Sequence, residues 1–227
     1  MRRNLVSILI LTIAVQIYAQ DDTEYRMEIG AGTGLVSYEG DFNGNIFKNM
    51  QPCGSLLWRY VLNPRMALRA MGSYGKLKGS SKGTTTYYPA IPNEAYSFDH
   101  AMGDLNATFE YNFWPYGTGR DYRGAKRLTP FVFGGIGIVY ANGSSKSVFA
   151  GQLPMGLGIK YKFGDRLNVG LEWSVHFSLS DELDGMKDPY QINSSGMFKN
   201  TDCYSALLIT LSYSFKAKCR TCHNADE

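Results

Sequence analysis

The sequence lacks long apolar runs, a marked excess of charge, and the spaced ligand sets of familiar catalytic or metal sites. After residue 19, no stretch approaches the roughly 18 consecutive apolar residues that a membrane-spanning helix needs. The 23 basic and 20 acidic residues give a net charge of +3, which gives no support for a nucleic-acid partner. No nucleophile elbow, phosphate-binding glycine loop or zinc-spaced ligand set is present. We therefore expect neither a helical membrane protein nor an enzyme.

The N-terminus is the exception to this lack of apolar runs. Arg2 and Arg3 precede an apolar stretch at residues 5–15, and Ala19 offers a small residue at a cleavage position. This pattern is typical of a secretory signal peptide, and the stretch is too short to span a bilayer. Removal of residues 1–19 leaves 21 basic (23 minus 2) against 20 acidic residues, a net charge of +1. Export would place the four cysteines in an oxidising space.

The dominant pattern in the rest of the chain is strict alternation of apolar and polar residues. The longest example covers residues 153–179 and turns at Gly164-Asp165-Arg166. A period of two residues on both sides of a Gly-Asp turn predicts a long β-hairpin. The full set of predicted strands is 25–36, 53–60, 66–78, 100–113, 129–140, 153–163, 167–179 and 204–215.

These eight strands predict an all-β fold, an eight-stranded antiparallel up-and-down transmembrane β-barrel of the outer-membrane type. The connections after the first, third, fifth and seventh strands are long, and the others are mostly short. Such barrels typically have longer loops at one end than at the other, with short periplasmic turns and longer extracellular loops. We expect residues 20–215 to form the barrel and residues 216–227 a periplasmic tail, with both termini in the periplasm.

A soluble barrel of the lipocalin type would show the same alternation, with the apolar face turned inward around a ligand. Three features favour the membrane barrel. The strands have about the 9–11 residues that a tilted path through the bilayer requires. Aromatic residues recur near strand ends, as in interfacial girdles. The polar face carries small residues and mixed charges, which would fill a narrow lumen; the charged members are Arg69, Asp104, Glu110, Lys160 and Glu172.

A basic connection between the fourth and fifth strands is one candidate site. Residues 114–127 contain four cations, Arg120, Arg123, Lys126 and Arg127, against Asp121 alone. Such a cluster favours a docking surface for a periplasmic protein by charge complementarity. The alternatives are a solvated loop and a contact with anionic lipid head groups in the outer membrane.

The cysteines form a second candidate. Cys219 and Cys222, followed by His223, match the CxxCH pattern of haem attachment, but only four residues follow. A redox CxxC centre would need a helix N-terminus to activate the thiol. We favour a disulfide from this tail to a periplasmic partner, with a local disulfide as the alternative. Cys53 and Cys203 both belong at the outer rim, where distortion of the loops would allow a disulfide between them.

The polar face also holds an apparent acid–base set. Glu172, Ser174 and His176 share one face of a strand, and Asp104 and Glu110 face the same interior. These residue types could serve a hydrolase within the barrel or its loops. A hydrogen-bond and ion-pair network inside the lumen is the more common use of such a set, and we expect that network.

Short motifs across residues 25–184 carry a resemblance to a known family. They are Ser37-Tyr38-Glu39-Gly40-Asp41, Leu62-Asn63-Pro64-Arg65, Leu128-Thr129-Pro130-Phe131, Gly134-Gly135-Ile136-Gly137 and Asn168-Val169-Gly170-Leu171-Glu172. The sequence resembles the PorG family, small outer-membrane barrels of the type IX secretion system of Bacteroidota. The resemblance implies an eight-stranded barrel that anchors the periplasmic ring of that machine, with a PorK-like lipoprotein and a PorN-like protein as partners. It implies no enzymatic activity and no cofactor.

Overall fold

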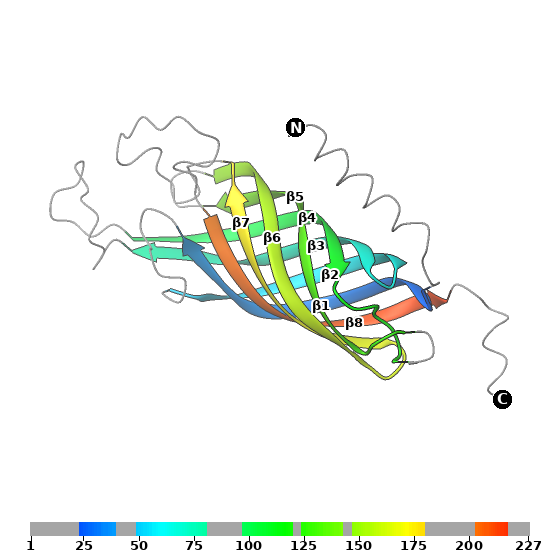
Figure 1. The fold of residues 1–227 in the computed structure, drawn as a ribbon. Helices are drawn as coiled ribbons and strands as arrows, with labels where there is room; N and C mark the ends of the chain where they lie inside the picture. Colours follow the sequence, from blue (N-terminus) through cyan, green and yellow to red (C-terminus); the bar gives the residue numbers. More distant parts are fainter. Residues whose placement is uncertain are drawn as a thin grey trace, which may run out of the picture.

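The protein forms one closed antiparallel barrel in which each strand pairs with its neighbours in chain order (Figure 1). The structure, a computed structural model, describes residues 23–39, 49–80, 97–119, 124–142, 147–179 and 203–217. None of these residues forms a helix long and apolar enough to cross a membrane. The strands are β1 (Tyr25–Glu39), β2 (Gln51–Asn63), β3 (Met66–Ser80), β4 (Ser97–Asn112), β5 (Leu128–Asn142), β6 (Ser147–Phe163), β7 (Leu167–Ser178) and β8 (Cys203–Ala217).

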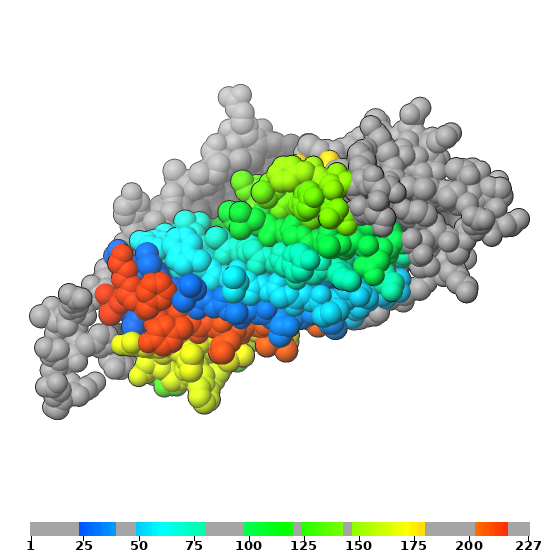
Figure 2. Space-filling view, turned by 180° about the vertical axis from the view of Figure 1, so that it is seen from behind, coloured from blue at the N-terminus to red at the C-terminus, as the bar shows by residue number. Residues whose placement is uncertain are grey.

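The barrel closes between its first and last strands. Tyr25 at the start of β1 pairs with Ala217 at the end of β8, and the pairing continues to Glu39 and Cys203. The start of β1, the end of β8 and the β2–β3, β4–β5 and β6–β7 connections therefore share one end, which we call the turn end. The opposite end is the loop end. Figure 2 shows the wall from behind, where β8, β1, β2 and β3 follow one another in orange, blue and cyan.

The alternation places apolar side chains outside and polar side chains inside. On β7, Leu171 and Trp173 are exposed on the outer wall, whereas Glu172 and His176 are buried. An apolar outer wall combined with a polar interior is the arrangement of a barrel that faces lipid. This confirms the predicted fold class. It also excludes the lipocalin alternative, because a lipocalin has its apolar face inside the barrel.

The structure moves one predicted boundary. The sequence suggested a long connection at residues 142–151, but β5 continues to Asn142 and β6 begins at Ser147. Val148 and Ala150 are buried on the inner face and Phe149 is exposed on the outer face, so the alternation extends through this segment. The Gly and Ser residues that signalled a loop concealed strand at residues 141–142 and 147–152.

Closure depends on glycines on the inner face of β1. An added Cβ at Gly34 would collide with the carbonyl oxygen of Leu207 on β8, whereas one at Gly54 would meet nothing closer than 4.0 Å. Gly34→Ala is therefore expected to lower the free energy of unfolding by about 1–3 kcal/mol through overpacking. Gly54→Ala is the matched control and should change it by less than about 0.5 kcal/mol. Urea unfolding in lipid vesicles measures both, and equal effects would contradict a tight β1–β8 seam.

Candidate functional site

The lumen near the turn end contains a buried chain of ion pairs. Arg59 bridges two carboxylates: its Nη1 donates to Glu28, and its Nε donates to Oε2 of Glu110 at 3.0 Å. Lys160 donates to the other oxygen of Glu110. All four side chains are buried and come from β1, β2, β4 and β6. The chain thus ties together strands on opposite sides of the barrel.

A second ion pair lies across the lumen. Nη1 of Arg69 donates to Oε2 of Glu172 at 2.5 Å, and Nε of Arg69 donates to Thr108 at 3.3 Å. The Arg69 guanidinium also lies 4.0 Å from the centroid of the Phe133 ring. Among the described residues, the interior holds four cations and four carboxylates: Arg59, Arg69, Lys160 and Lys162, with Glu28, Asp104, Glu110 and Glu172.

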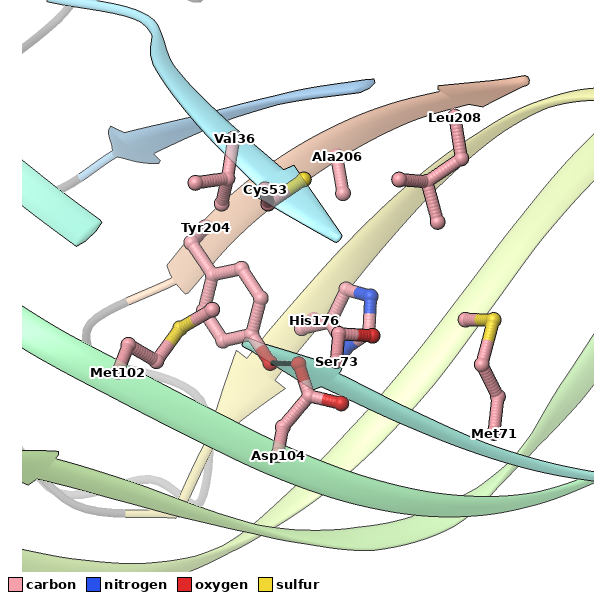
Figure 3. A pocket seen from close by; sticks show the side chains of 10 residues that line it. All are labelled: Val36, Cys53, Met71, Ser73, Met102, Asp104, His176, Tyr204, Ala206 and Leu208. Carbon is pink, nitrogen blue, oxygen red and sulfur yellow. Dashed lines mark hydrogen bonds between the residues drawn. The ribbon is translucent and has the colours of Figure 1, made fainter. Parts of the chain in front are cut away.

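A layer of hydrogen bonds, with no ion pair among the described residues, follows toward the loop end. The Tyr204 hydroxyl lies 2.9 Å from Oδ2 of Asp104 (Figure 3) and 2.8 Å from Oε1 of Gln152. Gln152 donates to Asn106 at 2.6 Å, and Asn106 donates to Asp104 at 2.7 Å. The His176 ring stacks on Tyr204 with centroids 4.4 Å apart. Together with the ion pairs, these contacts form the interior network that the sequence predicts.

The lumen near the loop end is apolar, which corrects the expectation of a polar interior throughout. Tyr38 and Phe98 make an edge-to-face contact with ring centroids 5.0 Å apart. Apolar side chains from five other strands join them, including Leu77, Val139 and Leu208. We call this group the apolar cluster. A charged layer below it and apolar side chains above leave the described lumen filled, as expected for eight strands.

The β4–β5 connection closes the lumen at the turn end. Tyr116 forms a bridge with Lys126, and its hydroxyl donates to Oδ1 of Asn168 on β7 at 2.8 Å. The ammonium groups of Lys160 and Lys162 lie 4.7 and 5.7 Å from the centroid of the Tyr116 ring. Burial raises the pKa of Tyr116 well above its ordinary value, so the phenol stays neutral and continues to donate. Sequence reasoning missed this residue, because a single inserted side chain has no periodicity.

Tyr116→Phe tests the contribution of this hydrogen bond. The phenyl ring keeps its place beside the lysines but leaves the Asn168 carbonyl oxygen without the Tyr116 donor. We expect a loss of about 1 kcal/mol in the free energy of unfolding, the usual value for one hydrogen bond. Tyr140→Phe, at a 46 % exposed position on the outer wall, is the control and should stay within about 0.5 kcal/mol. Identical stabilities for both variants would show that the Tyr116 hydroxyl contributes nothing.

The outer side of this connection presents exposed cations, one of which lies over an aromatic ring. Lys126 is exposed, with its ammonium 5.0 Å from the centroid of the exposed Trp114 ring. Arg127 is exposed, and its carbonyl accepts a hydrogen bond from the Lys162 amide at 2.8 Å. Arg65 donates to the Phe113 carbonyl at 2.7 Å. Two of the four predicted docking cations, Lys126 and Arg127, therefore lie together at the turn end. We call these two residues the cationic surface.

The remaining predicted partner-binding residues lie outside the described residues. These are Arg120 and Arg123 in the β4–β5 connection, and Cys219 and Cys222 in the tail. Their roles therefore stay predictions.

The rim disulfide that the sequence allowed is not formed: neither Cys53 nor Cys203 takes part in a disulfide. Their positions explain why. Cys53 pairs with Gly34 on β1, and Cys203 pairs with Glu39, five residues farther along that strand. Five residues of strand span about 16 Å, well beyond the limit of about 7 Å between Cα atoms in a disulfide. The sequence placed both cysteines at strand starts, but the shear of the barrel separates them.

The fold and its filled interior define the class, an eight-stranded barrel of the outer-membrane type. Residues 2–224 match the family described as a domain of unknown function, DUF6089. The chain belongs to that family. No match was found among curated proteins.

Solved structures share the fold. Neisserial surface protein A is 11 % identical, with a TM-score of 0.52, and the match covers 83 % of this chain and 97 % of that chain. OprG from Pseudomonas aeruginosa is 10 % identical, with a TM-score of 0.49 and coverages of 87 % and 99 %. Ail from Yersinia pestis is 13 % identical, with a TM-score of 0.45 and coverages of 86 % and 100 %. At such low identities, the similarity to Neisserial surface protein A establishes the fold alone.

Proposed function

We propose that this protein is a non-enzymatic outer-membrane barrel that anchors the periplasmic ring of a type IX protein secretion system. In this proposal the turn end faces the periplasm, because both barrel termini and the two shortest connections, β2–β3 and β6–β7, lie there. The motifs that resemble the PorG family support the choice of machine. The partners are a PorK-like lipoprotein and a PorN-like protein.

One observation carries the proposal. The β4–β5 connection is fixed from inside by Tyr116, so the cationic surface on its other side is held in position rather than free in solvent. Backbone hydrogen bonds reinforce this: the Tyr116 amide donates to Pro64 at 2.9 Å, and the Lys126 amide donates to Pro115 at 2.7 Å. A pre-organised surface binds a partner at a lower entropic cost than a mobile loop does. Its charge favours an acidic partner surface.

The filled lumen supports an anchoring role over a transport role. Eight strands leave an interior that side chains fill. Here the Glu110 ion pairs lie at one level, the apolar cluster at another, and Tyr116 at the turn end. A soluble cargo would have to displace all three. Binding of a partner at the turn end requires none of these changes.

The docking test compares a quadruple variant at the turn end with a double variant toward the loop end. Replacing Arg120, Arg123, Lys126 and Arg127 by Ser should reduce co-purification of the ring proteins with the barrel, most strongly at low salt, because exposed charges are screened by salt. Lys76→Ser with Lys78→Ser is the control, since these exposed cations lie toward the loop end of β3. Unchanged recovery from the turn-end variant, or equal loss from both, would refute the cationic surface as the docking site.

A covalent contact through the tail is the second part of the proposal. Exposed thiols in an oxidising compartment form intermolecular disulfides readily. Non-reducing electrophoresis of whole membranes should show a band of higher mass that disappears under reductant and in Cys219→Ser or Cys222→Ser. Cys203→Ser, at the loop end, should leave the band intact. Migration of the wild-type barrel as a monomer without reductant would remove the covalent link but leave the docking surface open to its own test.

A further inference from the structure

The β6–β7 turn carries an exposed arginine on the outer side of the barrel. Arg166 follows Gly164 and Asp165, and its carbonyl oxygen accepts a hydrogen bond from the Ser214 amide on β8 at 2.7 Å. Its Nη1 donates to the hydroxyl of Tyr213 at 2.8 Å. Tyr213 is 41 % exposed on the outer wall. The guanidinium of Arg166 therefore lies on the side of the wall and not over the lumen.

Two tyrosine rings hold this guanidinium in position. Its Cζ lies 5.6 Å from the centroid of the Tyr25 ring on β1 and 5.9 Å from that of the Tyr213 ring on β8. A guanidinium has five N–H donors, and contacts with two tyrosines leave several of them for another acceptor. No carboxylate among the described residues forms an ion pair with Arg166. Arg166 is thus a pre-organised cation that still has donors to offer to an anion.

The level of Arg166 along the barrel matches the edge of the apolar band. Phe163 and Leu167 flank the turn, pair with each other across the hairpin, and are both exposed on the outer wall. Figure 2 shows residues of this hairpin, in yellow, beside the orange end of β8 at the turn end. Aromatic side chains at strand ends mark the interface between hydrocarbon and lipid head groups. One residue beyond Leu167, Arg166 is at the level of the lipid phosphates.

We propose that Arg166, Tyr213 and Tyr25 form a binding site for the phosphate of a phospholipid, which we call the head-group site. Arg166 donates to the phosphate oxygens, and the two tyrosines position its guanidinium. The acyl chains lie along the apolar wall, beginning at Phe163 and Leu167. The head-group site is separate from the cationic surface and does not depend on the secretion role, because the leaflet at the turn end supplies the ligand.

The chemistry of the site favours a phospholipid over other anions. The planar fork of a guanidinium matches two phosphate oxygens, which makes arginine a preferred partner of phosphate. A soluble phosphate would make that contact alone. A phospholipid also covers Phe163 and Leu167 with its chains, and the burial of apolar surface adds to its affinity. An acidic protein would first have to displace the lipid that covers this wall.

Native mass spectrometry of the full barrel, released from detergent, tests the head-group site. The probe is dioleoyl phosphatidylglycerol. Diacylglycerol with the same chains lacks the phosphate, and glycerol phosphate lacks the chains, so the two compounds separate the contributions of head group and chain. Arg166→Gln removes the charge, and Arg166→Lys keeps the charge without the fork. Lys76→Gln, which changes an exposed cation toward the loop end of β3, is the control.

A single phosphatidylglycerol should bind more tightly than the others, and Arg166→Gln should weaken its binding about tenfold, as loss of a hydrogen bond to a charged group does. Arg166→Lys should recover only part of that loss, and Lys76→Gln should bind like the wild type. Tyr213→Phe should weaken phosphatidylglycerol about threefold and leave diacylglycerol unchanged, because the hydroxyl acts through Arg166. Tyr140→Phe, on the outer wall toward the loop end of β5, should change neither lipid.

Three results would overturn the head-group site, each with folding verified by heat-dependent migration on gels. The first is equal affinity of the wild type and Arg166→Gln for phosphatidylglycerol. The second is equal binding of diacylglycerol and phosphatidylglycerol, which would mean that the phosphate is not recognised. The third is displacement of the lipid by an equimolar amount of glycerol phosphate, which would assign the site to a soluble anion.

Discussion

Replacing Glu110 by glutamine is expected to lower the free energy of unfolding by about 3–5 kcal/mol, as breaking a buried ion pair does. Glu110 is fully buried and accepts hydrogen bonds from both Arg59 and Lys160. Glutamine keeps the shape but has one acceptor oxygen and no charge. Lys160 would then lack the carboxylate that it contacts, and Arg59 would keep only Glu28.

Urea unfolding in lipid vesicles, followed by tryptophan fluorescence, measures this loss. Asp99→Asn is the matched control because Asp99 is an exposed carboxylate on the same strand, and its change should lie within about 0.5 kcal/mol. A loss below about 1 kcal/mol in Glu110→Gln would mean that the interior cations are hydrated. That result would favour a water-filled channel and weaken the anchoring role.

Placing an arginine on the outer wall at Leu171 is expected to cost about 2–4 kcal/mol, the range for a cation at the bilayer midplane. Leu171 lies on β7 within the apolar band and is 49 % exposed. In a water-soluble protein, an arginine at so exposed a position would be almost neutral. The expected loss therefore arises from lipid and not from packing inside the protein.

Leu179→Arg provides the depth control for that substitution. Leu179 is also exposed, but it follows the last residue of β7 at the loop end. The cost of a cation falls to about 0–1 kcal/mol near the membrane interface. Equal losses of stability in Leu171→Arg and Leu179→Arg, measured by unfolding in the same vesicles, would show that the cost of an arginine does not depend on its depth in the membrane.

The sequence was sufficient for the strands and for the direction of most side chains. Trp173 and Glu172 face opposite ways because successive residues of a strand do, and ten or more alternating positions leave little choice. The prediction failed where both faces carry apolar residues. Val36 and Tyr38 at the loop end of β1 look like a continuation of an apolar face, yet they point into the lumen. Composition at strand ends therefore does not reveal what fills the interior there.

The features that sequence reasoning missed depend on contacts between distant strands. Tyr116 reaches Asn168, 52 residues away, and nothing in the local sequence of the β4–β5 connection marks it as the residue that turns inward. The separation of Cys53 from Cys203 follows from the register on β1, which the closed barrel sets. The head-group site likewise combines Arg166 with tyrosines from β1 and β8. The alternation of apolar and polar residues predicts which face of the sheet each side chain occupies. The register between paired strands determines which side chains on that face contact one another.

The central claim is that the apolar side of every strand contacts lipid. Nitroxide labels placed one at a time from Leu171 to His176 in the barrel, reconstituted in vesicles, test it most directly. Collisions with dissolved oxygen, which concentrates in lipid, should be high at positions 171, 173 and 175 and low at 172, 174 and 176. Low oxygen contact at the odd positions, or a barrel that stays dispersed without detergent or lipid, would contradict the account.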